Sequence, residues 1–299
     1  MKDLTSTAVL SSEKTLPVSE QPPPSAPPKV ALFDIDGTLV RPDHSIDPRI
    51  PPLLLHLERK GISVGFATGR ALFGATSILA QIPVNGPSMF FSGSLVCRPQ
   101  SGEVLFEQGM EHEEIFAIVE EAKRRHVYVE LYTRSGYFVE ELSPLAHMHG
   151  EYMGYLPKVC SFTDLAARQP VLKVVLIGEE GGSSGSTTHA CDEVVRKFSH
   201  IPCGVSFGAA HPGIVFANFT SVRASRERAL DVITEAVRAH RSEVASFGDA
   251  AADLEFIERV GFGIAMGNAL QEVRGRAQYV TESVEAHGVL PALKWLFSL

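Results

Sequence analysis

The sequence lacks the features that mark membrane-spanning and nucleic-acid-binding proteins. No apolar run approaches the ~20 residues that a helix needs to cross a bilayer. The formal net charge is −8, which argues against a nucleic-acid-binding surface, although an acidic protein can still hold a locally positive site for a small phosphorylated substrate. We therefore expect neither a membrane nor a nucleic-acid partner, and the sequence leaves the oligomeric state open.

Cysteine is also scarce. The chain has four cysteines, which form no Cys-x-x-Cys pair and no metal-binding spacing: Cys97, Cys160, Cys191 and Cys203. Structural disulfides are rare in the cytosol, where thiols are kept reduced. We interpret these residues as the reduced thiols of a cytoplasmic protein.

Residues 1–28 lack the apolar periodicity of a helix or a strand. They are rich in Ser, Thr and Pro, a composition that cannot bury enough apolar surface to fold. The segment has no apolar core of roughly 7–15 residues, as a signal peptide would. Asp3, Glu13 and Glu20 count against an organelle transit peptide. We predict a disordered tail over residues 1–28.

Short apolar runs alternate with amphipathic stretches on both sides of the middle of the chain. Predicted strands cover residues 29–34, 62–67 and 88–93, with predicted helices over 48–60 and 71–82 between them. Near the C-terminus, helices are predicted over 226–240 and 254–260, and strands over 243–249, 261–267 and 277–283. This alternation indicates a doubly wound, Rossmann-like parallel sheet.

The middle of the chain follows another pattern. A hairpin is predicted around Ser101-Gly102, a helix over 111–126, and two alternating strands, VYVELYT and GYFVEE, around a glycine-containing turn. Paired short strands with helices indicate an α+β module inserted into an α/β core. The predicted division is a core of residues 29–110 and 206–299, and a cap domain of residues 111–205.

Two acidic residues, Asp34 and Asp36, follow the first predicted strand, where open α/β sheets bind ligands. Residues two apart in an extended segment point to the same side, so these carboxylates repel each other unless a cation or a proton intervenes. Mg²⁺ prefers such oxygen ligands. With a metal bound, one carboxylate can act as a nucleophile and the other as a general acid. A solvated acidic turn is the alternative.

Two further strand ends carry polar side chains. Asp249 follows the predicted strand at 243–249, and Asp253 lies four residues later. They could complete an oxygen cage, or simply cap a helix N-terminus. Thr68 ends a third strand in FATGR, and its hydroxyl could donate to a phosphate oxygen or cap a helix. Arg70 could pair with an anion or lie on a helix surface.

Taken in order, four motifs resemble those of the haloacid-dehalogenase superfamily, and more narrowly the Cof-type phosphatases with a type-two B cap. They are DIDGT, ATGR, a basic residue before AL, and GDAAAD followed by GFGIAMGNA. The resemblance extends from about residue 29 to the C-terminus. It implies a Mg²⁺-dependent phosphomonoesterase that acts on small soluble phosphates, such as sugar phosphates, and whose cap domain selects the substrate.

The resemblance also implies a role for each site residue. Asp34 would attack phosphorus and form an aspartyl-phosphate, and Asp36 would protonate the leaving alkoxide and then deprotonate the hydrolytic water. Thr68 would hydrogen-bond the phosphoryl group. Mg²⁺ would be held by the Asp34 side chain, the Asp36 carbonyl and Asp249.

The chain departs from the family pattern in its later motifs. Arg226 replaces the usual lysine of the third motif, and Ala252 replaces the asparagine of the fourth. Arginine keeps the charge but changes reach and geometry. Two other functions therefore stay open: a phosphosugar mutase, and a catalytically weakened binding or regulatory protein. His147 and His149 have the spacing of a metal pair, but we expect a surface helix there.

Overall fold

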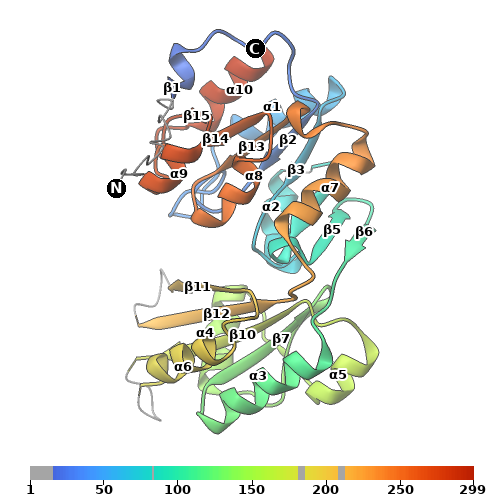
Figure 1. Cartoon of the computed structure of the whole chain (residues 1–299), viewed down its shortest axis with the longest axis vertical. Coiled ribbons are helices and arrows are strands. Elements are labelled where there is room, and N and C mark those ends of the chain that lie inside the picture. The colour runs from blue at the N-terminus through green and yellow to red at the C-terminus, as the bar shows by residue number, and fades with distance from the viewer. Residues whose placement is uncertain (1–15, 83, 181–185, 208–212) are drawn as a thin grey trace, which may run out of the picture.

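A six-stranded, all-parallel sheet forms the centre of the first domain in this computed structural model, which describes residues 16–82, 84–180, 186–207 and 213–299 (Figure 1). Its strands, in spatial order, are β1 (Leu16–Pro17), β15 (Tyr279–Val280), β14 (Phe262–Ala265), β13 (Val244–Gly248), β2 (Val30–Phe33) and β3 (Ser63–Phe66). A separate antiparallel sheet contains β4 (Ser88–Phe90), β5 (Leu95–Arg98) and β6 (Glu103–Glu107), with the predicted hairpin between the last two.

Helices cover both faces of the parallel sheet, because its central strands are apolar on both sides. In β2, Ala31 and Phe33 pack with α1 (Ile50–Arg59) and α10 (Val289–Phe297). Val30 and Leu32 pack on the opposite face with α7 (Arg226–Val237) and α8 (Leu254–Ile257). The shorter helices α2 (Thr76–Gln81) and α9 (Gln271–Arg276) complete this domain. The predicted doubly wound fold is confirmed.

A second, mixed sheet forms the inserted domain, below the first in Figure 1. Its strands, in spatial order, are β11 (Cys203–Phe207), β12 (Ile214–Thr220), β10 (Lys173–Glu179), β7 (Tyr128–Thr133), β8 (Gly136–Val139) and β9 (Lys158–Val159). Its helices are α3 (His112–Arg124), α4 (Pro144–Met153), α5 (Phe162–Arg168) and α6 (Thr188–Lys197). In the described ranges, no helix has both the length and the apolarity to cross a membrane.

The predicted end of the inserted domain, at residue 205, is too early. Strand β12 lies beyond that point and pairs with both β10 and β11. It therefore belongs to the sheet of the inserted domain, which ends after Thr220. Long-range strand pairing sets this boundary, and local composition does not reveal it.

The expected surface helix in HMHG is also partly wrong. Both histidines lie on α4, and His147 is exposed, but His149 is only 4% exposed. Its Nδ1 lies 2.9 Å from an oxygen of Glu130 on β7. A face of α4 thus packs on the sheet, with His149 buried and His147 exposed.

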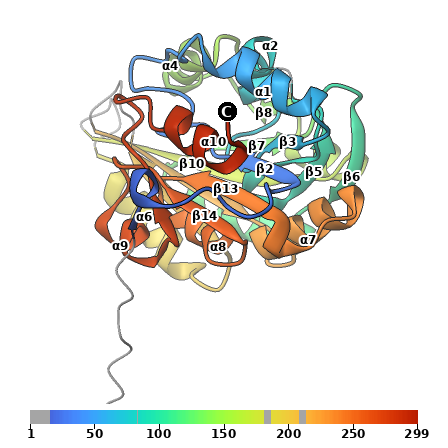
Figure 2. The same ribbon diagram turned by 90° about the horizontal axis from the view of Figure 1, so that it is seen from above.

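The prediction of a disordered tail over residues 1–28 is wrong for its second half, whereas residues 1–15 lie outside the described ranges. Strand β1 pairs in parallel with β15, and the 3-10 helix η1 (Val18–Glu20) buries Val18 in the core. The segment then passes beside α10 (Figure 2). There the Trp295 indole donates a hydrogen bond of 2.7 Å to the Pro22 carbonyl. The segment has no periodic pattern, but backbone pairing and the burial of Val18 hold it against the core.

Val18→Ala should therefore destabilise the protein. The substitution removes two buried carbon atoms from a packed site, so we expect the free energy of unfolding to fall by about 1–3 kcal/mol. Ser19→Ala is the matched control. Because Ser19 is exposed, this change should leave the midpoint of chemical denaturation almost unchanged. Equal midpoints for the parent and Val18→Ala would show that this segment does not stabilise the core.

Candidate active site

The carboxyl ends of three neighbouring strands converge at one edge of the parallel sheet. The register pairs Phe33 of β2 with Phe66 of β3 on one side and with Phe247 of β13 on the other. Because these partners are level, the residues that follow them emerge at the same edge. Asp34, Thr68 and Asp249 are thereby brought into one region, as parallel α/β sheets favour for ligand sites.

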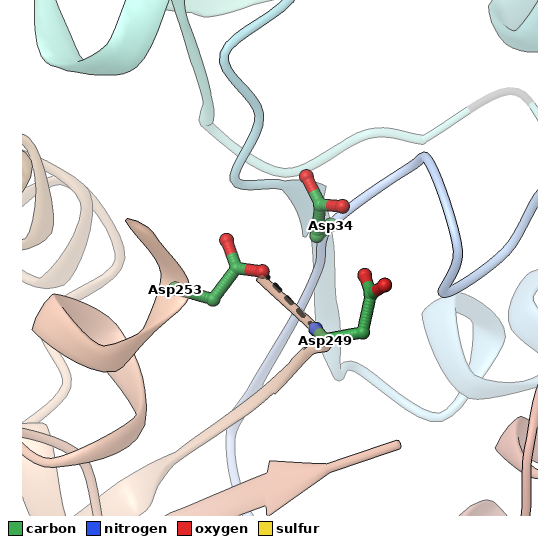
Figure 3. Close-up of side chains that lie close together, drawn as sticks. All are labelled: Asp34, Asp249 and Asp253. Carbon is green, nitrogen blue, oxygen red and sulfur yellow. Dashed lines mark hydrogen bonds between the residues drawn. The ribbon is translucent and has the colours of Figure 1, made fainter. Parts of the chain in front are cut away.

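Three carboxylates crowd together at this edge (Figure 3). Asp34, Asp249 and Asp253 each offer an oxygen, and these oxygens all lie within 4.8 Å of one another. Burial, followed by the charges of Asp253 and Asp36, raises the pKa of Asp34 well above its ordinary value. Burial and Asp253 raise the pKa of Asp249 to about 6. A cation would relieve this repulsion and restore the ionised forms.

Asp253 differs from the other two acids because its oxygens already have partners. One oxygen accepts hydrogen bonds from the backbone N–H groups of Asp249 and Ala250, at 3.1 and 3.0 Å. The other oxygen accepts a bond of 3.2 Å from the Arg226 guanidinium. Asp253 thus fixes the turn that presents Asp249 and anchors Arg226. Burial raises its pKa, and Arg226 opposes that effect.

Arg226 is the arginine that the structure brings to the acids. Its side chain is 8% exposed at the first turn of α7, behind the N-cap Ser225. The neighbouring arginines lie elsewhere: Arg223 pairs with Glu111 at 2.9 Å, and the Arg228 guanidinium lies over the ring of Phe106. Of these three arginines, Arg226 is therefore the one that contacts the acidic group.

Asp36 is not one of the three crowded acids, and its carboxylate has a partner of its own. Its carboxylate accepts two hydrogen bonds from Arg70, from Nε at 2.7 Å and from Nη2 at 2.5 Å. The Asp36 side chain is 57% exposed, so this ion pair faces solvent. Arg70 thus pairs with an acidic side chain of the protein, and its pairing with a substrate anion stays a prediction. Asp34 and Asp36 leave the same strand end, but Arg70 holds the Asp36 carboxylate, whereas the Asp34 carboxylate lies with Asp249 and Asp253.

Thr68 is buried at the end of β3 and has one lone pair engaged. Its Oγ1 accepts a hydrogen bond of 3.1 Å from the Arg70 backbone N–H. The Ser92 N–H donates to the Thr68 carbonyl at 3.3 Å, which ties two adjoining loops together. The hydroxyl hydrogen of Thr68 is left for an acceptor such as a phosphoryl oxygen.

Two residues of the site, Thr38 and Asn268, carry no prediction from the sequence. The Thr38 hydroxyl donates to Asp249 at 3.4 Å. The Asn268 amide donates to the other oxygen of Asp249 at 3.2 Å and to the Gly37 carbonyl at 2.9 Å. Asn268 follows β14, so the strand-end rule that selected Asp249 could have found it. An amide is thus present at Asp249 although Ala252 lacks one.

Gly37 explains how these loops approach so closely. Its φ of +75° favours glycine, and a β-carbon there would lie 2.3 Å from a carboxylate oxygen of Asp249. Any side chain would therefore force either the first loop or the Asp249 carboxylate to move. The DIDGT turn needs its glycine both for conformation and for space.

A cavity of about 1070 Å³ adjoins this group of residues between the two domains. Arg70 lines it from the core, and Tyr132 and Lys173 line it from the inserted domain. The Lys173 ammonium donates a hydrogen bond of 2.9 Å to the carbonyl of Gly69, next to Thr68. A small molecule held at the strand ends can therefore extend into the cavity.

The side chains present fit a hard divalent cation. Asp34 and Asp249 supply oxygen atoms, which Mg²⁺ prefers. The Asp34 carboxylate accepts no hydrogen bond from any of the described residues, in contrast to Asp253. A buried carboxylate without a donor and with a raised pKa lacks a positive partner, which a cation would supply.

Comparison with known proteins agrees with the geometry. The family model described as haloacid dehalogenase-like hydrolase matches residues 31–293. Two HMP-PP phosphatases, from Cronobacter sakazakii and Citrobacter koseri, are 23% and 24% identical to this chain, each over 82% of this chain and 86% of the relative.

Solved structures share the fold. A phosphatase of the haloalkanoate (HAD) enzyme superfamily from Bacteroides thetaiotaomicron has a TM-score of 0.75 and 24% identity, and the match covers 93% of this chain and 98% of that one. A sugar phosphatase of HAD subclass IIB has a TM-score of 0.71 and 22% identity, with 89% and 98% covered. The chain belongs to the haloacid dehalogenase-like hydrolases, and its fold, including the inserted domain, is similar to that of the subclass IIB sugar phosphatase.

Proposed function

We propose that this hydrolase is a Mg²⁺-dependent phosphomonoesterase that acts on small phosphorylated metabolites, sugar phosphates or similar compounds. The observation that carries the proposal is the buried Asp34 carboxylate, which lies beside Asp249 and Asp253 and accepts no hydrogen bond from the residues that the structure describes. The phosphatase names of the matched relatives support the same reaction class. Free thiols at all four cysteines support the cytoplasmic location predicted from the sequence.

Asp34 would act as the nucleophile. One of its oxygens attacks phosphorus, the bond from phosphorus to the leaving oxygen breaks, and an aspartyl-phosphate forms. Water then attacks the same phosphorus and releases inorganic phosphate, which regenerates the carboxylate. The Thr68 hydroxyl and the Arg226 guanidinium would stabilise charge on the phosphoryl oxygens or on Asp34 itself. The contact of Arg226 with Asp253, a neighbour of Asp34, supports this role.

Asp36 would move the proton in both steps. It would protonate the leaving alkoxide and then take a proton from the attacking water. Arg70 holds both oxygens of Asp36, so Asp36 must exchange this partner to donate a proton. An anionic substrate is a natural competitor for the Arg70 guanidinium.

Mg²⁺ would be held by the Asp34 and Asp249 carboxylates and by the main-chain carbonyl of Asp36, and when bound it supplies positive charge to the phosphoryl oxygens. The pairing of the Asp36 carboxylate with Arg70 supports a main-chain role for Asp36 at the metal. Asp253 and Asn268 would hold Asp249 in position.

Phosphate release from a panel of phosphorylated metabolites, with and without Mg²⁺, tests this function. A phosphosugar mutase would form an isomer without releasing inorganic phosphate. A binding or regulatory protein would retain its ligand unchanged.

Asp34→Asn should lower turnover by more than about 10³-fold, because an amide cannot attack phosphorus. The fold should persist with equal or higher melting temperature, since the change removes one of three repelling carboxylates. Asp192→Asn on the exposed face of α6 is the matched control. Phosphate release by Asp34→Asn near the parent rate would exclude Asp34 as the nucleophile.

The effect of Mg²⁺ on melting temperature should increase with pH. The pKa of Asp249 in the folded state is about 6, above its ordinary 3.8, so its protonation stabilises the fold and that stabilisation is lost as pH rises towards 6. Mg²⁺ replaces the proton, so the rise in melting temperature on adding Mg²⁺ should be larger near pH ~7.5 than near pH ~5. Excess chelator should also abolish phosphate release. An equal shift at both pH values, or full activity after confirmed metal removal, would contradict this site.

Arg226→Ala should lower turnover by about 10²–10³-fold, because the acidic group loses its buried cation. Arg226→Lys should keep part of the rate, since the charge remains. The exposed Arg228 offers the control, and Arg228→Ala should match the parent. Steady-state kinetics on one substrate, with circular dichroism to confirm folding, would decide. Loss of activity in Arg228→Ala or Arg223→Ala alone would reassign the third motif.

A further inference from the structure

The cavity between the domains carries charge of one sign. Its lining includes three cationic side chains, Arg70, Lys158 and Lys173, and none of the described residues that line it is acidic. The protein as a whole has a net charge of −8, so the cavity reverses the sign of its surroundings. A cavity of this kind raises the local concentration of anionic ligands.

One acid does lie on the same face of the inserted sheet, but its charge is enclosed. Glu130 is fully buried and accepts hydrogen bonds from the hydroxyls of Tyr128 and Tyr132, at 3.0 and 2.9 Å. His149 contacts it from α4. With these partners, the Glu130 carboxylate is satisfied within the domain and does not serve as the counterion of a cavity lysine.

Lys173 stands out among the three cations. It begins β10, where it is level with Tyr132 of β7 and Thr220 of β12. It is 7% exposed, and its ammonium contacts the Gly69 carbonyl and the face of the Phe91 ring. Within the described chain, no carboxylate forms a salt bridge with it, whereas Arg70 is occupied by Asp36 and Lys158 is exposed.

A buried ammonium without an anion is unfavourable. Burial, followed by the charge of Arg226, lowers the pKa of Lys173 to about 8. The group is therefore still mainly protonated at neutral pH. The charged Lys173 side chain lines the cavity. An anionic group of a ligand bound there would supply the missing counterion.

The position of Lys173 defines which part of a substrate it meets. Gly69, its partner, lies between Thr68 and Arg70, at the boundary between the strand ends and the cavity. With the phosphoryl group at Asp34, the leaving group of an ester would extend past Arg70 into the cavity.

We propose that the cavity selects phosphate esters whose leaving group carries a second anionic group, a carboxylate or a further phosphate, and that Lys173 is the residue that binds it. This inference rests on the proposed phosphomonoesterase function and adds the substrate class. Lys173 is a specificity residue in this account, and Asp34, Asp36 and Thr68 act at phosphorus.

A pair of substrates that differ only in this group tests the proposal. In 6-phosphogluconate, carbon 1 is a carboxylate, and in sorbitol 6-phosphate it is an alcohol. The parent enzyme should prefer 6-phosphogluconate in kcat/KM by about 10- to 100-fold, the range expected for one hydrogen bond to a charged group. The ratio of the two substrates within one variant cancels any general loss of activity.

Lys173→Met should remove the preference, with the ratio falling to about two or less, because the neutral side chain cannot attract the carboxylate. Its melting temperature should equal or exceed that of the parent, since an uncompensated buried charge is replaced by an apolar group. Lys173→Arg should keep part of the preference. Lys123→Met, on the outer helix α3, is the matched lysine control and should keep the full ratio.

Binding measured by calorimetry separates this inference from the function on which it rests. Asp34→Asn should bind 6-phosphogluconate more tightly than sorbitol 6-phosphate, and the additional Lys173→Met change should equalise the two. If the preference in binding is found but the parent releases no phosphate, the phosphomonoesterase function fails and the anion site stands. Equal affinities in Asp34→Asn, or a preference that survives Lys173→Met, would overturn the role of Lys173. A lower melting temperature with an unchanged ratio would make Lys173 a structural contact between the domains.

Discussion

Repulsion among three carboxylates, two buried and one half-buried, is the constraint on which the rest of this structure depends. Asp34, Asp249 and Asp253 each have a carboxylate oxygen within 4.8 Å of those of the other two. Burial disfavours the charged forms of Asp34 and Asp253 and raises their pKa values. One buried guanidinium, that of Arg226, forms a salt bridge with Asp253. That single charge cannot neutralise three acids. The negative charge that Arg226 leaves uncompensated favours the binding of a metal ion at this site.

The inserted domain also brings a positively charged side chain, Lys173, to the loops at the strand ends. Lys173 comes from β10 yet contacts the loop of Thr68 and Arg70 in the core. Rings from the two domains also stack, with Phe73 of the core lying 5.5 Å from Tyr132 of the inserted sheet. The wall of the cavity and the loops of the acidic site are thus joined. Substrate choice and phosphoryl chemistry can be coupled through these few contacts.

Much of the fold could be predicted from the sequence, because its signals are local. Apolar runs followed by polar turns located β2, β3 and β13, and the carboxyl-end rule then selected Asp34, Thr68 and Asp249. What the sequence could not provide depends on contacts between distant segments. The end of the inserted domain needed the pairing of β12 with β10, and the order of residues 16–28 needed the docking of Val18 and Pro22 near α10.

The same limit applies within the site. The strand-end rule could mark Asn268 as a polar residue after β14, but not its contact with Asp249. That contact, across 19 residues, depends on β14 lying next to β13 in the sheet. The partner of Asp36 was equally hidden, because Arg70 could have faced solvent on a helix. Its bidentate contact with Asp36 is a three-dimensional fact. Residue type and spacing located the acids, and side-chain geometry assigned their partners.

The central claim is that Asp34 carries the phosphoryl group during turnover. Rapid quenching of the enzyme with substrate, followed by borohydride reduction, converts an aspartyl-phosphate into homoserine at the reacting position. Peptide mass spectrometry should then find homoserine at residue 34, only when substrate is present and not in Asp34→Asn. Sustained phosphate release with an unmodified Asp34, or with homoserine at another aspartate, would contradict the account.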